Sequence, residues 1–391
     1  MADAHELDAW LRLSLTPGVG DVASRHLLAA FGLPQQVFEQ SEAALRQVVS
    51  AAQTRALLQP PEGWAQACEA VQTWLAGGSN RQVLTLADAG YPSELLEMAD
   101  PPLMLYALGD VALLSHPTRL AVVGSRNPTA QGAQTARDMC RSLAGSGVCI
   151  VSGLALGIDG AAHEGALDAG GSTIAVVGTG LDRVYPRRHL DLAHRLAQQG
   201  LLISEFPLGT SPAQANFPKR NRIIAGLSQG TLVVEAALAS GSLITARCAA
   251  DMGRDVMAIP GSIHSTQAKG CHALIRQGAK LVETAQDVLE ELRVMVRCGG
   301  EASPATLPLS DEGSLQGDEG LSGDDERSEV APISPICPVL DAMGHAPIGL
   351  DAIQARTGLP TPALQARLFD LELDGHLARM PGGLFQRIVR T

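Results

Sequence analysis

Leu120-Ala-Val-Val-Gly-Ser-Arg126 gives the clearest indication of the fold in this chain of 391 residues. Four apolar residues run into a glycine and two polar residues, which is typical of a buried strand that ends in a tight turn. Similar runs recur downstream, separated by segments long enough for a crossover helix. They cover residues 148–151, 173–177, 201–204, 231–234 and 256–259. This alternation predicts an α/β fold: an extended, Rossmann-like, doubly wound and mostly parallel sheet.

Outside this sheet the pattern predicts further domains. Residues 1–80 have helical periodicity with a break at Pro17-Gly-Val-Gly20, which predicts a small helical domain similar to a SAM or helix-hairpin-helix module. A lead-in segment, residues 81–118, is expected to pack on the Rossmann-like domain of residues 119–297. Residues 298–332 are rich in Gly, Ser, Pro and acidic residues and predict a flexible acidic linker. Residues 333–391 predict a winged helix, with two helices followed by a Pro381-Gly-Gly383 hairpin.

Composition and charge limit the function classes. Hydrophobic residues make up 46% and charged residues 18% of the chain, as in a globular protein. There is no apolar run long enough to span a membrane, and the acidic N-terminus does not resemble a signal peptide, so a cytoplasmic location is expected. The seven cysteines are scattered without a Cys-x-x-Cys pair, so neither a metal nor another cofactor is expected.

The net charge of −12 is distributed unevenly. Residues 119–282 contain 16 basic and 10 acidic side chains, a net charge of +6. Residues 1–118 and 301–330 each carry a net charge of −8. A basic centre between acidic segments favours a polyanionic ligand for the central domain.

Candidate binding residues follow the predicted strands, where a doubly wound sheet places its ligands. Glycine there lets backbone amides approach a phosphate closely, and hydroxyl and basic side chains can complete the site. The candidates after the strands are Gly124, Ser125, Arg126, Ser152, Gly153, Gly157, Ser240, Gly241, Ser242 and Thr245.

The densest basic cluster is Phe217-Pro-Lys-Arg-Asn-Arg222. Lys219, Arg220 and Arg222 could neutralise consecutive phosphates, Asn221 could hydrogen-bond the backbone or a base, and Phe217 could stack on a base. Phe217 could equally be packed in the core. Glu235 is expected to hold the basic segment in place. Together these residues favour single-stranded nucleic acid as the ligand.

Several enzymatic motifs are missing. The chain has no G-x-x-x-x-G-K-[ST] phosphate loop, and Gly178-Thr-Gly180 lacks the third glycine of a dinucleotide fingerprint because position 183 is Arg. The spacing of Ser, Cys, His and Asp residues does not indicate a Ser-His-Asp or Cys-His catalytic arrangement. We therefore expect no catalytic residues and a binding protein rather than an enzyme.

The central domain closely resembles the DNA-processing protein A family, also called DprA or Smf. The shared motifs include Val122-Val-Gly-Ser-Arg126, Ser152-Gly-Leu-Ala-Leu-Gly-Ile-Asp159 and Phe217-Pro-Lys-Arg-Asn-Arg222. Others are Gly178-Thr-Gly-Leu-Asp182 with Tyr185-Pro186, and Glu235 through Ser242. The resemblance implies a homodimer formed through the Rossmann-like domain that binds single-stranded DNA and loads the recombinase RecA on incoming DNA in natural transformation. It also implies a winged-helix tail.

Two alternatives remain open. Gly230-Thr-Leu-Val-Val-Glu235 matches part of a phosphoribohydrolase motif, which would make the chain a nucleotide-hydrolysing enzyme or a nucleotide sensor with Glu235 and Arg126 in its pocket. The winged helix could instead bind duplex DNA. However, its second predicted helix carries only Arg367 against three acidic residues, so a protein-contacting or regulatory role has at least equal support.

Overall fold

The computed structural model describes residues 4–299, 338–343, 348–357, 359, 361–373, 376–380 and 384–388. It divides into two compact units, residues 1–292 and 293–391, and each is described by itself. No described helix has the length and apolar character needed to cross a membrane.

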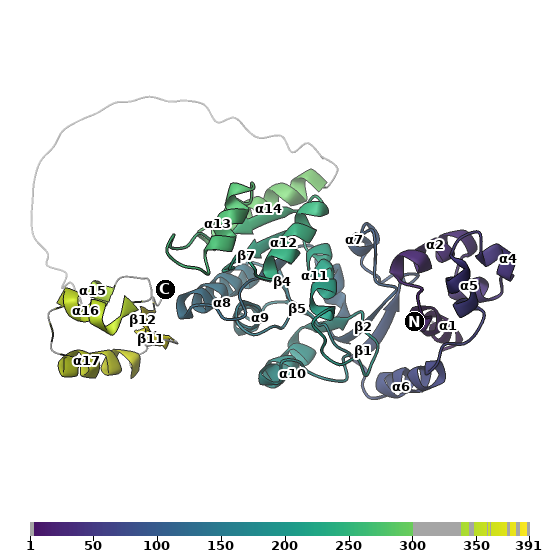
Figure 1. The fold of residues 1–391 in the computed structure, drawn as a ribbon, viewed down its shortest axis with the longest axis horizontal. Helices are drawn as coiled ribbons and strands as arrows, with labels where there is room; N and C mark the ends of the chain where they lie inside the picture. Colours follow the sequence, from purple (N-terminus) through teal and green to yellow (C-terminus); the bar gives the residue numbers. More distant parts are fainter. Residues whose placement is uncertain are drawn as a thin grey trace, which may run out of the picture. The chain divides into compact units, whose positions relative to one another are not determined.

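The first unit is built on a nine-stranded sheet with the order β1-β2-β6-β5-β4-β3-β7-β8-β9 (Figure 1). The six strands from β3 to β8 and the short β9 are parallel to one another, whereas β2 pairs antiparallel with both β6 and the edge strand β1. The strands are β1 (Arg81–Thr85), β2 (Met104–Gly109), β3 (Arg119–Val123), β4 (Cys149–Ser152), β5 (Thr173–Val176), β6 (Leu201–Ser204), β7 (Gly230–Val233), β8 (Asp255–Ala258) and β9 (Lys280–Leu281).

The six strands predicted from the sequence are confirmed as β3 to β8, each to within one residue at either end. Three strands were missed. β1 and β2 lie in the segment interpreted only as a lead-in, and β2 pairs antiparallel with β6 to extend the sheet. β9 has only two residues, too few to give a recognisable pattern.

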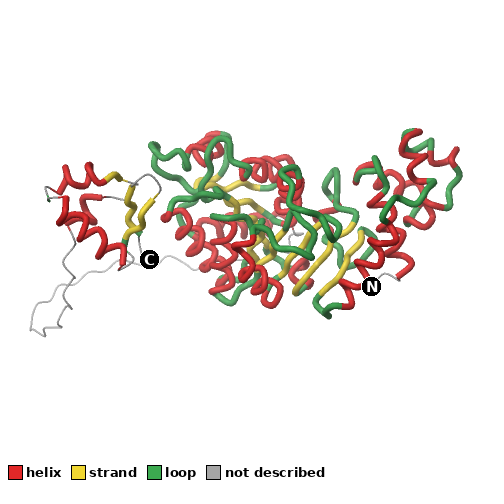
Figure 2. Tube along the Cα trace, turned by 60° about the horizontal axis from the view of Figure 1, so that its bottom comes forward, coloured by secondary structure: helices red, strands yellow, loops and turns green. Residues whose placement is uncertain are grey.

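Helices cover both faces of the sheet, and the strands lie between them in Figure 2. On one face α8 packs on α9 and α9 packs on α10, whereas α11 and α12 pack together and contact β3 and β7. Aliphatic residues from β3 to β8 are buried, as expected of strands in a sheet that has helices on both faces. The helical elements of this part are α7 (Ser93–Leu96), η1 (Val111–Ser115), α8 (Ala130–Gly145), α9 (Ile158–Asp168), η2 (Arg187–His189), α10 (Leu190–Gln199), α11 (Asn216–Leu227), α12 (Ser242–Asp251), α13 (Lys269–Arg276) and α14 (Ala285–Gly299).

The N-terminal part of this unit is helical. Its helices are α1 (Ala4–Leu15), α2 (Asp21–Phe31), α3 (Pro34–Phe38), α4 (Glu42–Leu45), α5 (Ala51–Leu57) and α6 (Trp64–Ala76). The predicted break at residues 17–20 is confirmed, because α1 ends before it and α2 begins directly after it. Trp10, Leu13 and Leu27 share a buried cluster with Leu103 and Tyr106, so the helices pack on the segment that carries β2.

The second unit contains α15 (Pro338–Met343), β10 (Ile348–Gly349), α16 (Leu350–Thr357), α17 (Thr361–Leu373), β11 (Leu377–Met380) and β12 (Leu384–Arg387). A three-stranded sheet of order β10-β12-β11 accompanies the helices, as predicted for a winged helix. The predicted acidic linker and the Pro381-Gly-Gly383 turn lie outside the described residues. The domain boundaries proposed from the sequence remain predictions.

Candidate nucleic-acid interface

One cavity of the first unit lies where the strand order reverses. β3 sits between β4 and β7, so the loops that follow these three strands diverge and leave a space at the carboxyl edge. This cavity, called here the switch-point pocket, has a volume of about 410 Å³. Nine of the predicted binding residues line it, namely Gly124, Ser125, Arg126, Arg220, Asn221, Ser240, Gly241, Ser242 and Thr245.

The floor of the switch-point pocket depends on a close approach between two loops. Ile158 N, at the start of α9, donates to Ser125 O over 3.1 Å. Gly157 precedes it with a φ of +84°, and a Cβ there would collide with Ser125 O. Only glycine meets both conditions without strain. Gly157 therefore shapes the site through its backbone and does not line the cavity.

The opposite wall is the beginning of α12. Gly241 precedes the first residue of this helix, and the Ser240 and Ser242 hydroxyls lie 2.7 Å apart. Asn221 of α11 donates from Nδ2 to Gly241 O over 3.3 Å, which ties the two helices together beside the pocket. Small residues and hydroxyls next to a helix N-terminus suit a phosphate oxygen.

Two buried residues of opposite charge, Asp159 and Arg220, line the pocket. The Asp159 carboxylate accepts hydrogen bonds from Gly153 N at 3.1 Å and Ala155 N at 3.4 Å, which fixes the loop after β4. Arg220 is 3% exposed and donates from Nη1 to Gly153 O and Val176 O. Burial lowers the pKa of Arg220 to about 10, whereas Asp159 opposes this shift. Burial also raises the pKa of Asp159.

A second, smaller cavity adjoins the first and shares Arg126 and Arg220 with it. This aromatic slot of about 60 Å³ is lined by Leu156, Tyr185, Pro186 and Phe217. Tyr185 and Phe217 are stacked, with centroids 5.7 Å apart and planes 29° from parallel. Phe217 is half-buried and walls the slot, so the alternative of a core-packed Phe217 is wrong.

Arg126 lies where the two cavities meet. Its guanidinium carbon is 5.2 Å from the Phe217 ring centroid, within the range of a cation–π contact. The side chain is exposed, and no carboxylate of the described residues is within ion-pair distance of it. Its charge is therefore available to an anionic ligand.

The basic segment is the first half of α11 rather than a loop, and the helix sends its cations in different directions. Arg222 is buried and pairs with Glu205 at 2.5 Å, Asp100 at 3.1 Å and Asp21 at 3.3 Å. Lys219 is half-exposed and lies 3.5 Å from Asp21 and 3.6 Å from Glu205. Two cations against three carboxylates leave this cluster without excess positive charge.

The expectation that Arg222 neutralises a DNA phosphate is therefore wrong, because three carboxylates already surround its buried guanidinium. Arg220 is not a surface cation either, since its Nη1 serves backbone carbonyls in the interior. Of the predicted cations, Arg126 alone lines both cavities with an exposed side chain.

Two further expectations are corrected. Ser152 is fully buried and donates to Val122 O over 2.6 Å, so its hydroxyl joins β4 to β3 and is not offered to a ligand. Glu235 does not hold the basic segment. It accepts from Thr129 N at 2.9 Å and from Thr129 Oγ1 at 2.6 Å, and so anchors the start of α8. Glu205 takes the supporting role instead.

Four residues beside the site had no predicted role, namely Tyr185, Asp159, Glu205 and Asp21. Tyr185 and Asp159 lie in motifs quoted above, but neither those motifs nor the Glu205-Phe-Pro207 segment gives a local sign of what the side chains contact. Asp21 is 201 residues from Arg222 in the sequence, so only the folded chain brings them together. No described group of three or more His, Cys, Asp or Glu side chains is arranged to hold a metal ion.

Comparison with known proteins identifies the family of this chain. A family model described as DNA recombination-mediator protein A matches residues 82–293, and a model of the DprA winged helix domain matches residues 334–383. Protein Smf of Escherichia coli K12 is 43% identical over 305 residues, covering 78% of this chain and 77% of that protein. The chain belongs to the DNA-processing protein A (DprA/Smf) family.

Other DprA proteins agree with this assignment. DprA of Streptococcus pneumoniae R6 is 49% identical over 207 residues, which cover 53% of this chain and 73% of that protein. The X-ray structure of the Streptococcus pneumoniae protein has a TM-score of 0.64 and 38% identity, covering 74% of this chain and 98% of that one. A Helicobacter pylori DprA structure, described by its single-stranded DNA binding mode, has a TM-score of 0.50 and 33% identity, covering 55% of this chain and 98% of that one.

Proposed function

We propose that this protein binds single-stranded DNA at the switch-point pocket and the aromatic slot. The sugar-phosphate backbone would pass Arg126 and the turn formed by Ser240, Gly241 and Ser242, and one base would lie against Phe217. A site that combines an unpaired cation, backbone amides and an aromatic face suits an unpaired strand, whose bases are free to stack. Binding through the backbone is expected to be largely independent of sequence and sensitive to salt.

The observation that supports this proposal most directly is the position of Arg126. It is exposed, lacks an ion-pair partner among the described residues, and borders both a polar pocket and an apolar slot. A phosphate and its neighbouring base could therefore be held on either side of one side chain. A small apolar ligand would leave this charge unused.

The family supports a more specific part of the proposal. We infer that the protein acts in the cytoplasm without catalysing a reaction, as a homodimer formed through its Rossmann-like domain. It would transfer single-stranded DNA to RecA during natural transformation. Light scattering would test the dimer, and the rate of RecA filament growth on strands covered by single-strand-binding protein would test the transfer.

Replacing Arg126 tests the DNA site. Arg126→Ala should weaken binding to labelled oligo-dT and reduce the slope of log affinity against log salt by about 0.7, the contribution of one phosphate contact on a single strand. Fluorescence anisotropy at several salt concentrations measures both quantities. Arg276→Ala is the matched control, because Arg276 is exposed at the end of α13 and lines neither cavity. Equal slopes in the two variants would refute the role of Arg126.

The alternative functions receive less support from the geometry. Glu235 lines neither cavity and both of its carboxylate oxygens accept hydrogen bonds from Thr129, so it is not positioned as the acid or base of a phosphoribohydrolase. Release of free base from nucleoside monophosphates would nevertheless reveal such an activity. Duplex binding by residues 333–391 alone would support a role for the winged helix as a DNA regulator.

A further inference from the structure

The turn after β4 contains a residue in a strained backbone conformation. Leu154 has a φ of +56°, a left-handed value that is uncommon for a residue with a side chain, and it is 1% exposed. Such a conformation persists only where surrounding contacts enforce it. Gly153, Ala155 and Leu156 of the same turn line the aromatic slot. The conformation of this turn therefore sets one wall of the slot.

Three side chains hold this turn. Asp159 accepts from the two backbone amides that flank Leu154, and Arg220 donates to the carbonyl that precedes it. The third is His189, whose Nδ1 lies 3.0 Å from Leu154 O. A carbonyl oxygen can only accept, so Nδ1 carries the hydrogen. Of these three side chains, His189 alone binds the strained residue itself.

His189 is also bound to a second wall of the slot. Tyr185 and Pro186 form that wall, and the backbone N of His189 donates to Pro186 O over 3.0 Å. One residue thus connects two backbone segments that border the slot, through its side chain to one and through its main chain to the other. His189 is partly buried and lines neither cavity, so it would not touch a strand bound there.

The imidazole of His189 packs closely on α9. A Cβ on Gly160 of this helix would lie 2.6 Å from His189 Cε1 and 2.9 Å from Nε2, too close for the ring to stay where it is. Glycine at this position leaves the space that the ring occupies. Substituting Gly160 is therefore a way to displace His189 without changing it.

We propose that His189 is a positioning residue of the DNA site, which holds the turn after β4 and the Tyr185-Pro186 segment in place relative to each other. The slot of about 60 Å³ is smaller than a cavity of about 150 Å³ that accommodates benzene, so an entering base must displace part of its lining. Tyr185 is 48% exposed and is free to turn outward by side-chain rotation, while His189 keeps both backbone segments fixed. This inference rests on the proposed single-stranded DNA site and adds a residue that acts on it without contacting the strand.

This role predicts a selective defect. Without the His189 contact both segments gain conformational freedom, and ordering them again opposes the binding of a base. Arg126 and the Ser240–Ser242 turn belong to neither segment, so contacts to the sugar-phosphate backbone should be kept. Loss of the contact should therefore weaken the binding of strands that carry bases and leave the binding of an abasic strand unchanged.

The experiment uses the full chain and compares oligo-dT with an abasic strand of equal length by fluorescence anisotropy. His189→Leu keeps a bulky side chain but has no donor. It should lower the affinity for oligo-dT at least about fivefold, within the roughly 5- to 150-fold that one stacked base contributes. His189→Asn places an N–H donor close to the position of Nδ1 and should restore most of this affinity. His194→Leu is the control, because His194 is exposed in α10 and lines neither cavity.

Gly160→Ala tests the same role with His189 unaltered. The added Cβ displaces the imidazole, whereas alanine favours a helix more than glycine does, so folding should be retained. The affinity for oligo-dT should fall and that for the abasic strand should not. Gly145→Ala is the matched control, because a Cβ on this helical glycine of α8 meets nothing within 4 Å.

The possible outcomes separate this role from the proposed function. Unchanged oligo-dT affinity in His189→Leu, or an equal loss on the abasic strand, would overturn the role of His189 and leave the DNA site in place. Should His189→Leu fail to fold, as judged by its melting curve, full oligo-dT affinity in Gly160→Ala would overturn the role instead. If the unaltered protein bound neither strand, the proposed function itself would be refuted.

Discussion

Three arginines around this site have different environments, although two of them are only two positions apart in α11. Arg126 is exposed beside Phe217, Arg220 donates to backbone carbonyls, and Arg222 is enclosed by carboxylates. Their shared charge predicted a shared role. The surroundings decide otherwise, because a cation already neutralised in the interior gains little from an external phosphate.

Arg222 is expected to contribute to stability rather than to DNA binding. Its side chain is 8% exposed and that of its partner Glu205 is 5% exposed. Arg222→Ala leaves Glu205 buried without its main counter-charge, which should reduce the free energy of unfolding by about 3–5 kcal/mol. Urea denaturation measures the loss. Arg46→Ala is a control that removes an exposed pair with Glu42 and should cost less than about 1 kcal/mol.

The same variant has a predicted pH dependence. Burial raises the pKa of Glu205, and Arg222 opposes this rise. Without Arg222 the pKa of Glu205 should rise further above its unfolded value. A folded state with the higher pKa binds a proton more readily, so the variant should regain stability as the pH falls through that pKa. A stability deficit that stays constant or grows on acidification would contradict this explanation.

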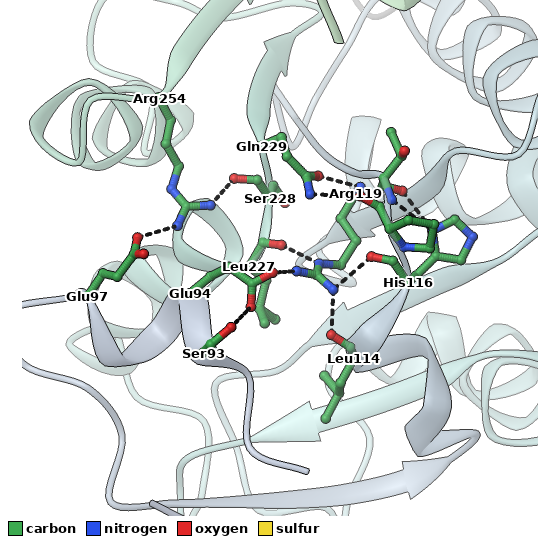
Figure 3. Close-up of polar contacts among 12 residues, drawn as sticks. Ser93, Glu94, Glu97, Leu114, His116, Arg119, Leu227, Ser228, Gln229 and Arg254 are labelled. Carbon is green, nitrogen blue, oxygen red and sulfur yellow. Dashed lines mark hydrogen bonds and ion pairs between the residues drawn. The ribbon is translucent and has the colours of Figure 1, made fainter. Parts of the chain in front are cut away.

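At the scale of the element, α11 is the component that positions the site. Its first half carries Phe217, Arg220 and Asn221, and its last turn is held at the opposite end by a separate polar network (Figure 3). There the buried Arg119 donates to Leu227 O and also contacts Glu94. Arg254 donates to Ser228 O, directly after the helix. Basic side chains satisfy the carbonyls that a helix leaves unpaired at its C-terminus.

Arg119→Met tests this support. Arg119 is 2% exposed and also donates to the carbonyls of Leu114 and His116. A methionine fills much of the space but leaves these acceptors and Leu227 O without their donor, at about 1–3 kcal/mol for each unsatisfied group. We expect a loss of at least about 3 kcal/mol in thermal or urea unfolding. Arg254→Met should cost less, because Arg254 serves one carbonyl and a carboxylate that is itself exposed. Equal losses would show that Arg119 is not the main support.

At the scale of the whole molecule, the charge distribution separates the proposed DNA site from the acidic segments of the sequence. All residues lining the two cavities lie between positions 123 and 267, within the basic central part of the chain. Residues 301–330 carry a net charge of −8 and should repel single-stranded DNA by long-range electrostatics rather than by direct contact.

A chain that ends at residue 299 should therefore bind oligo-dT at least as tightly as the full chain. Any gain should appear at low salt and vanish at about 1 M salt, where exposed charges more than about 3 Å apart are screened. Anisotropy titrations of both chains at two salt concentrations test this. A large loss of affinity in the shorter chain at high salt would show that the C-terminal unit contributes to the DNA site.

Local sequence patterns were enough to predict the six parallel strands, the break before α2 and the edge of the sheet that carries the proposed ligand site. Alternating apolar runs and glycine turns encode these features locally. The sequence also identified nine residues of the switch-point pocket. Seven of them follow predicted strands, whose carboxyl ends lie at one edge of the sheet, and Arg220 and Asn221 belong to the basic cluster. The antiparallel strands β1 and β2 were less evident, since β2 gains its neighbours from segments far away in the sequence.

Which charges remain available to a ligand depends on contacts between segments that are far apart in the sequence. Asp21, Asp100 and Glu205 come from three separate segments, and their meeting at Arg222 turns an apparent phosphate ligand into an internal ion pair. The pairing of Tyr185 with Phe217 and the commitment of Glu235 to Thr129 arise in the same way. A residue's type fixes its charge and its hydrogen-bonding capacity. Burial and long-range partners determine whether either remains available to a ligand, and both depend on the complete fold.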